Sequence, residues 1–256
     1  KSKIDSIREQ ANALDNKLNN VAEASVENLG TLSNGDHLIA FPGYLATETG
    51  RTVVSFSRTS KNISDSAIKT SEPITMSGYN KGDQSVIYNG SELLLWNTKT
   101  GIIGSGFSNR VPAKDDAIGL TVYNGKAYFV DKSTRKVMKY SIGDSTVSTP
   151  STSLENISEI ANASDMAIDG NIYIAAAGTI LKYNAGAKQE FNIGVSNLPD
   201  NTKIYTENGF VNLYVLDPAG KRILVLTKDG AVAQTLTSSQ FNDLKDFYVD
   251  EKSKEI

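Results

Sequence analysis

Five charged side chains offer the clearest chance of chemistry in this sequence: Asp83, Asp116, Asp165, Lys203 and Asp246. Asp165 opens the stretch DMAIDG and Asp246 opens DFYVDE, so both lie five residues before the same turn position of a repeated pattern. Carboxylate oxygens are the ligands that Ca²⁺ prefers, and a few convergent polar groups can also orient an organic ligand. The five residues therefore predict a ligand site with Ca²⁺ as its candidate ion, and the alternative is that they cap turns and stay hydrated.

Other familiar catalytic groups are scarce in the 256 residues. The chain has no Cys, which excludes disulfides, zinc–thiolate sites and Cys nucleophiles. Its single His, His37, follows a turn directly, and this position predicts a solvent-exposed side chain without a chemical role. No phosphate-binding glycine motif is present, and no organic cofactor is expected. No residue can be assigned a catalytic role from the sequence, and an enzyme is not the preferred class of protein.

The charge distribution narrows the classes of partner. The formal net charge is −3 and the pI is about 5.3, with Lys and Arg scattered along the chain. A nucleic-acid-binding protein needs a concentrated basic face, so this class is excluded. No apolar stretch approaches the length of a transmembrane helix, so this segment is not expected to insert into a membrane. Because the chain does not begin with Met, we expect an upstream segment, which would favour an extracytoplasmic or membrane-anchored location.

The first 28 residues differ in pattern from the rest. Their apolar residues are spaced alternately by three and four positions, at Ile4, Ile7, Ala11, Leu14, Leu18 and Val21. This heptad spacing predicts a coiled-coil-type helix over residues 1–28. A helix this short with so narrow an apolar stripe is marginal alone. We therefore expect it to pair with another subunit, with an upstream helix or with a groove on its own domain.

An Asn-Gly or Asp-Gly pair recurs through the remaining sequence. Its glycines stand at positions 35, 90, 125, 170 and 209, and a degenerate sixth copy, DEKSKEI, places Glu251 at the equivalent position. Asn-Gly favours tight hairpins because a type I′ turn needs positive φ at both central residues. The spacings of 55, 35, 45, 39 and 42 residues define a repeat of roughly 43 residues.

This repeat predicts an all-β fold over residues 29–256: a β-propeller of about six four-stranded blades, the last one incomplete. In the third copy the expected strands are 117–125, 126–135, 136–142 and 145–150. First strands begin near the mouth of the central channel, so the five charged residues are expected to meet there. Since the sixth copy stops inside its second strand, we expect the native chain to continue for about twenty residues.

The repeated stretches resemble NHL-like six-bladed propellers over roughly residues 30–256. The resemblance lies in the Asn-Gly turn, the runs AYFVD and LYVLD that follow it, and the basic residues Lys136 and Arg222. A heptad helix before such blades also resembles small-genome bacterial proteins with an upstream PPM-type phosphatase domain. That likeness implies a non-catalytic propeller end and carries no catalytic residue over to this chain.

We therefore expect a non-enzymatic binding or scaffold module, presented on the helix, that docks a protein, peptide or glycan partner. The competing hypothesis is a metal-assisted hydrolase or lyase that uses the channel carboxylates. A third is a sensor arm that regulates an upstream phosphatase domain.

Overall fold

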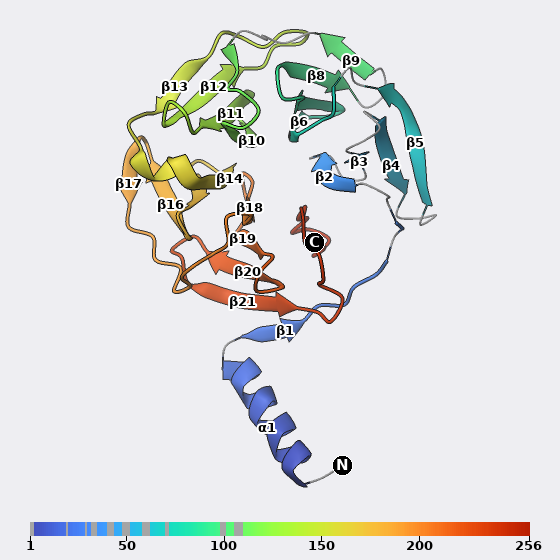
Figure 1. Ribbon diagram of the computed structural model, residues 1–256, viewed down its shortest axis with the longest axis vertical. Coiled ribbons are helices and arrows are strands. Elements are labelled where there is room, and N and C mark those ends of the chain that lie inside the picture. The colour runs from blue at the N-terminus through green and yellow to red at the C-terminus, as the bar shows by residue number, and fades with distance from the viewer. Residues whose placement is uncertain are drawn as a thin grey trace.

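The computed structural model describes residues 3–18, 20–28, 30–31, 35–39, 44–47, 52–57, 62–69, 72–97, 101–104 and 110–256. Within these ranges the sheets stand around a common centre, and a single α-helix, α1 (Lys3–Leu18), projects outward from the rim (Figure 1). The predicted all-β propeller with an N-terminal helix is confirmed.

The first three sheets each contain four antiparallel strands. The first sheet consists of β2 (Gly35–Ile39), β3 (Tyr44–Thr47), β4 (Thr52–Ser57) and β5 (Asn62–Lys69). The second consists of β6 (Met76–Lys81), β7 (Gln84–Tyr88), β8 (Leu93–Asn97) and β9 (Gly101–Gly104). The third consists of β10 (Ala117–Tyr123), β11 (Lys126–Asp131), β12 (Lys136–Ser141) and β13 (Ser151–Leu154).

The remaining two sheets follow a short 3₁₀ helix at Ser158–Asn162. The fourth sheet consists of β14 (Ala163–Ile168), β15 (Ile172–Ala176), β16 (Thr179–Asn184) and β17 (Ala187–Gln189). The fifth consists of β18 (Lys203–Tyr205), β19 (Asn212–Asp217), β20 (Arg222–Thr227) and β21 (Val232–Thr237), with β1 (Val21–Glu23) added at its outer edge, parallel to β21. In Figure 1 the first strand of each sheet lies closest to the centre.

The expected count of about six blades is wrong for the described residues. Four sheets are the predicted four-stranded blades, the fifth sheet has five strands, and no further sheet forms in the described ranges. The sixth copy accounts for the missing blade, because residues 238–256 form no sheet of their own. A second error lies in the register: each Asn-Gly pair was taken as the turn after a first strand, but the pair at 89–90 joins β7 to β8, and Gly35 begins β2.

The turn that follows the first strand of the second sheet contains Gly82, which has φ +56°. With this glycine, the turns stand at 82, 125, 170, 209 and 251, so the repeat is far more even than the Asn-Gly pairs indicated. Among these five turns, Asn124–Gly125 alone has positive φ at both central residues (+47° and +66°), as the predicted type I′ turn requires. Elsewhere other turn geometries serve the same connection.

Strand prediction inside the repeats was accurate for the third and fifth copies. The first three strands of the third copy are confirmed, whereas its outer strand β13 begins at Ser151 and not within 145–150. In the fifth copy the same pattern predicts strands within 202–209, 211–220, 221–230 and 231–237, and all four are confirmed as β18 to β21. Inner and middle strands are predictable because neighbouring sheets cover both of their faces and they must be apolar, whereas outer strands carry a weaker pattern.

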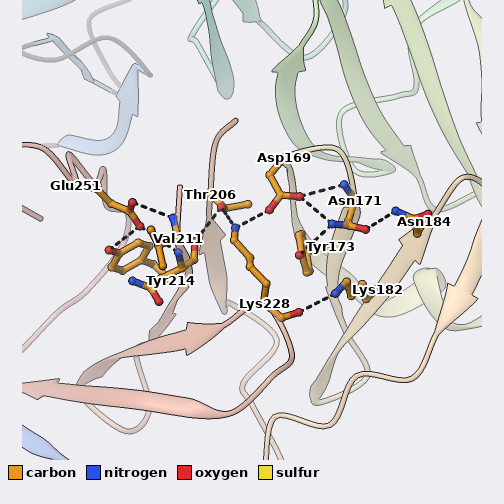
Figure 2. Close-up of polar contacts among 11 residues, drawn as sticks. Asp169, Asn171, Tyr173, Lys182, Asn184, Thr206, Val211, Tyr214, Lys228 and Glu251 are labelled. Atoms are coloured by element: carbon orange, nitrogen blue, oxygen red, sulfur yellow. Dashed lines mark hydrogen bonds and ion pairs between the residues drawn. The ribbon is translucent and has the colours of Figure 1, made fainter. Parts of the chain in front are cut away.

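The C-terminal residues 238–256 take the position of a further inner strand between the fifth and first sheets. Phe247 and Val249 pack against Leu216 and Val225 of the fifth sheet. Glu251, the residue that replaces the turn glycine, accepts hydrogen bonds from Val211 N, Asn212 N and the Tyr214 hydroxyl at 3.0, 3.1 and 3.1 Å (Figure 2). The degenerate sixth copy therefore attaches this segment to the fifth sheet.

Apolar clusters fill the spaces between neighbouring sheets. Val130 of the third sheet packs with Ile174 of the fourth, and Tyr173 of the fourth packs with Leu213 of the fifth. Trp96, which the sequence places in an apolar run, is fully buried between the first and second sheets. The inner strands therefore line the central channel, and the apolar clusters between the sheets hold them in position.

The helix is shorter than the predicted 1–28. It ends at Leu18, and Val21, the last residue of the heptad pattern, lies in β1 because pairing with β21 satisfies its backbone. Its apolar side chains face solvent: Ile4, Ile7 and Leu14 are 64%, 57% and 59% exposed. A division of the chain at residue 28, and pairing of the helix with another copy, stay predictions. None of the described helices is long and apolar enough to cross a membrane.

Candidate functional site

A pocket of about 280 Å³ occupies the centre of the ring. It is lined by residues from six chain segments: the first strands β2, β6, β10, β14 and β18 and the C-terminal residues 246–248. Two of its lining residues, Asn124 and Asn208, lie in the turns that follow first strands and are exposed to solvent. We call this end of the pocket its open end. Three of the five predicted site residues, Asp165, Lys203 and Asp246, line this pocket.

The other two predicted residues lie elsewhere. Asp83 belongs to the turn between β6 and β7, and Asp116 precedes β10 in a turn where its N–H donates to the carbonyl of Ala113 at 2.9 Å. Neither residue lines the central pocket. The wrong prediction for Asp83 follows from the Asn-Gly pair at 89–90. When this pair is taken as the turn after a first strand, β7 is mistaken for the inner strand of the second sheet, and Asp83 directly precedes β7.

His37 was expected to be exposed, and this expectation is wrong. Its side chain is 18% exposed and its Nδ1 lies 3.3 Å from Oδ2 of Asp246. The same carboxylate oxygen accepts the backbone N–H of Leu38 at 2.9 Å. His37 is therefore the site residue that sequence reasoning missed, because Gly35 begins β2 and His37 lies within this inner strand.

Asp165 makes the corresponding contact between the fourth and fifth sheets. Its Oδ2 accepts the backbone N–H of Ile204, the next inner strand, at 2.8 Å. Asp165 and Asp246 thus make the same kind of contact, as their equal register predicts: each carboxylate joins its own inner segment to the next inner strand around the ring. Ser164 adds a second link between the same two sheets, since its hydroxyl donates to the carbonyl of Thr202 at 2.9 Å.

The two aspartates differ in their acidity. Burial raises the pKa of Asp165, more than the nearby Lys203 and the Ile204 N–H lower it. At Asp246 burial also acts upward, but the hydrogen bond and charge of His37, the Leu38 N–H and Lys203 together bring its pKa below the usual value of 3.8. Asp246 is therefore held as a carboxylate. At Asp165 the neighbouring positive charge and N–H group do not offset the effect of burial.

A second polar cluster lies nearer the open end of the pocket. The Tyr205 hydroxyl donates a hydrogen bond to Oε1 of Glu207, and the Tyr248 ring packs edge-on against the Tyr205 ring, with 5.3 Å between the ring centres. Burial raises the pKa values of both Tyr205 and Glu207. All three residues line the pocket. No pattern in the sequence indicates this cluster, because its members come from β18, the following turn and the C-terminal segment.

Metal-binding potential can be judged from side-chain grouping. In the parts of the chain that the structure describes, no three His, Cys, Asp or Glu side chains come together as a possible metal site. Asp165 and Asp246 each use an oxygen to accept a backbone N–H, which leaves fewer lone pairs for an ion. Ca²⁺ binding by these residues stays a prediction.

Outside the pocket, Lys228 connects the fourth and fifth sheets (Figure 2). Its Nζ lies 2.5 Å from Oδ2 of Asp169 and donates to the Thr206 hydroxyl. It also lies 5.6 Å from the centre of the Tyr173 ring. Lys182 completes the group, since its Nζ donates to the Lys228 carbonyl at 2.7 Å. Burial lowers the pKa of Lys228 more than Asp169 raises it.

We expect Lys228 and Asp169 to stabilise the fold as a pair. In a double-mutant cycle of Lys228→Met and Asp169→Asn, the coupling free energy should be about 1–3 kcal/mol, because the partners are in direct contact and largely buried. Urea denaturation of the four proteins at pH 7 measures it. Effects that add within about 0.5 kcal/mol would show that the two side chains act independently.

Comparison with known proteins shows the fold and no family. No family model and no curated protein matches the sequence. Among solved structures, streptogramin B lyase is similar with a TM-score of 0.57 and 13% identity, over 85% of this chain and 72% of that chain. A protein in the nidogen/laminin complex has a TM-score of 0.57 and 10% identity, over 78% of this chain and 77% of that chain.

A third similar structure is regucalcin from Agrobacterium tumefaciens, described as a calcium-binding protein. Its TM-score is 0.57 at 10% identity, over 85% of this chain and 79% of that chain. Identities this low show a shared β-propeller fold and nothing more. The set includes an enzyme and a component of a protein complex, so the fold alone does not select a function.

Proposed function

We propose that this chain is a rigid, non-enzymatic binding module. The open end of the central pocket, with the turns around it, docks a protein or peptide partner, and α1 serves as a stalk that carries the ring. The metal-assisted hydrolase or lyase and the sensor arm of a phosphatase stay alternative predictions.

The observation that supports binding over catalysis is that the carboxylates of the pocket wall are engaged in structural hydrogen bonds. Asp165 and Asp246 accept backbone N–H groups of the neighbouring inner strands, and Asp246 also contacts His37. Groups committed in this way hold the channel wall in place and give a preorganised surface, which lowers the entropic cost of binding.

The size of the pocket supports a partner that inserts a small group. Pockets for drug-sized ligands usually measure about 300–1,000 Å³, and this one measures about 280 Å³. It fits a single side chain better than a large organic substrate. The similar propeller from the nidogen/laminin complex is consistent with a protein-docking role for this architecture.

Site-specific photo-crosslinking tests the proposal. We expect p-benzoylphenylalanine at Asn124 or Asn208, both exposed at the open end, to capture the same protein from cells that express the chain. The purified partner should then bind the unmodified chain in calorimetry. The matched control carries the probe at Glu190, which is exposed beyond the outermost strand β17. Equal capture at Glu190, or no binding by the purified protein, would contradict the proposal.

A further inference from the structure

We infer that the open end of the pocket receives a cationic group, namely the ammonium or guanidinium of a lysine or arginine side chain in the partner. This inference rests on the proposed binding function and specifies its chemistry.

The first observation is the composition of the wall near the opening. Four tyrosines line the pocket, Tyr79, Tyr123, Tyr205 and Tyr248. Aromatic faces attract cations electrostatically, and surrounding aromatic rings form the usual receptor for ammonium groups. This protein already uses the same contact inside its own structure, where Lys182 and Lys228 lie 5.7 and 5.6 Å from the centre of the Tyr173 ring.

The second observation is that Glu207 has no positive partner in the part of the chain that the structure describes. Two other buried carboxylates each have one: Asp169 has Lys228 at 2.5 Å and Asp217 has Arg222 at 2.8 Å. No Lys, Arg or His nitrogen of the described residues lies within 4.0 Å of Glu207. Its contact is the Tyr205 hydroxyl, a neutral donor that does not balance a negative charge.

The charges deeper in the pocket do not compensate Glu207. Lys203 interacts with both Asp165 and Asp246, and His37 lies against Asp246. Three carboxyl groups thus line the pocket with one lysine and one histidine. A buried carboxylate without a counter-charge is costly, and burial does raise the pKa of Glu207. A cation that enters from the open end would supply the missing charge.

The third observation is the polar rim. Asn80, Asn124 and Asn208 line the pocket, and the latter two are exposed. Carboxamides offer both donors and acceptors, so they can bind the peptide backbone on either side of an inserted side chain. Together the rim, the tyrosine wall and Glu207 match a long, straight side chain that ends in a cation. A neutral glycan would satisfy the rim but would leave Glu207 uncompensated.

A peptide titration tests this inference. The probes are acetyl-Gly-Lys-Gly-amide, its neutral analogue with norleucine in place of Lys, and lactose. With NMR as the readout, we expect the lysine peptide to bind the full chain at least about tenfold more tightly than the norleucine peptide. We expect lactose not to bind.

Variants assign the effect to Glu207. Glu207→Gln keeps the size and an acceptor for Tyr205, and should weaken the lysine peptide about tenfold while leaving the norleucine peptide unchanged. Glu190→Gln, at an exposed carboxylate outside the pocket, should change neither. Tyr205→Phe removes only a hydroxyl and should retain lysine binding, which gives a second folded variant. Circular dichroism confirms that each variant is folded.

The outcomes separate this inference from the proposed function. Equal binding of the two peptides, an unaffected Glu207→Gln variant, or binding of lactose in place of the lysine peptide would overturn the cationic ligand. If a partner still crosslinks at Asn124 and Asn208 in that case, the binding module stands without it. If the lysine peptide binds but no partner docks, the cation site is supported and the protein-docking function fails.

Discussion

Substitution of Gly119 by Ala is expected to lower the free energy of unfolding by more than about 3 kcal/mol. Gly119 lies in the inner strand β10 with φ +63°, a conformation that costs an L-residue about 1–2 kcal/mol. An added Cβ would lie 2.7 Å from the Met166 Cβ and 3.0 Å from the Asp165 carbonyl carbon, and closer still to the Met166 backbone nitrogen. The inner strand of the fourth sheet would have to move away, and with it the pocket residue Asp165.

Gly125 supplies a matched control for this prediction. It has nearly the same φ, +66°, but an added Cβ would meet nothing within 4 Å. Gly125→Ala should therefore cost only the conformational term, about 1–2 kcal/mol. Urea denaturation of both variants at pH 7 separates backbone strain from steric contact. Equal losses for the two variants would contradict close packing between β10 and β14.

Asp246→Asn is expected to lower the stability of the ring by about 2 kcal/mol at pH 7, because a charge-assisted contact is replaced by a neutral one. Asn keeps an oxygen for the Leu38 N–H but loses the negative charge beside His37. Because the folded pKa of Asp246 is lowered, its contribution is present above the unfolded value of 3.8 and is lost as the pH falls through the folded value. The difference from the parent protein should therefore shrink below pH 3.8.

Asp165→Asn should behave in the opposite way, although the two residues have the same register. The folded pKa of Asp165 is raised by burial, so ionisation opposes folding, and this penalty grows as the pH rises from 3.8 through the folded value. Asn can still accept the Ile204 N–H. We expect this variant to be at least as stable as the parent at pH 7.

Thermal and urea unfolding between pH 3 and pH 8 measure both effects together. A loss of stability at pH 7 in both variants would show that the two carboxylates have the same role. A loss for Asp246→Asn that persists unchanged to pH 3 would show that His37 and Lys203 do not hold its charge. The expected contrast would instead identify Asp246 as the electrostatic link that joins the C-terminal segment to the first sheet.

The inner and middle strands were predictable because the residues that they require, an apolar run followed by a turn, stand next to one another in the sequence. A strand covered by two neighbouring sheets must be apolar along its whole length, as Leu93–Trp96 and Tyr214–Leu216 are, and a turn needs Asn, Asp or Gly. The equal placement of Asp165 and Asp246 on the pocket wall could also be predicted, since register within a repeat preserves direction relative to the channel.

The errors arose where one local motif can serve two purposes. Asn-Gly makes a tight turn between any two antiparallel strands. The pair at 89–90 therefore gave a wrong position for the inner strand of the second sheet, and Asp83 was wrongly placed at the pocket as a result. Val21 continues a heptad pattern, but the edge of β21 offers backbone partners that a solvent-exposed helix does not. Burial of His37 depends on the C-terminal segment, which is more than 200 positions away in the chain.

By itself the sequence determined the fold class, the repeat and three of the pocket residues, because hydrophobic pattern and turn chemistry act over a few neighbouring positions. Only the tertiary structure decided which charges are paired. Closing the ring brings Asp246 against His37 and places Tyr248 beside Tyr205, and the electrostatics of such pairs depend on distance and burial, which local sequence does not encode. The same closure leaves Glu207 without a cation among the residues that the structure describes, and the proposed recognition of a lysine or arginine side chain follows from that arrangement.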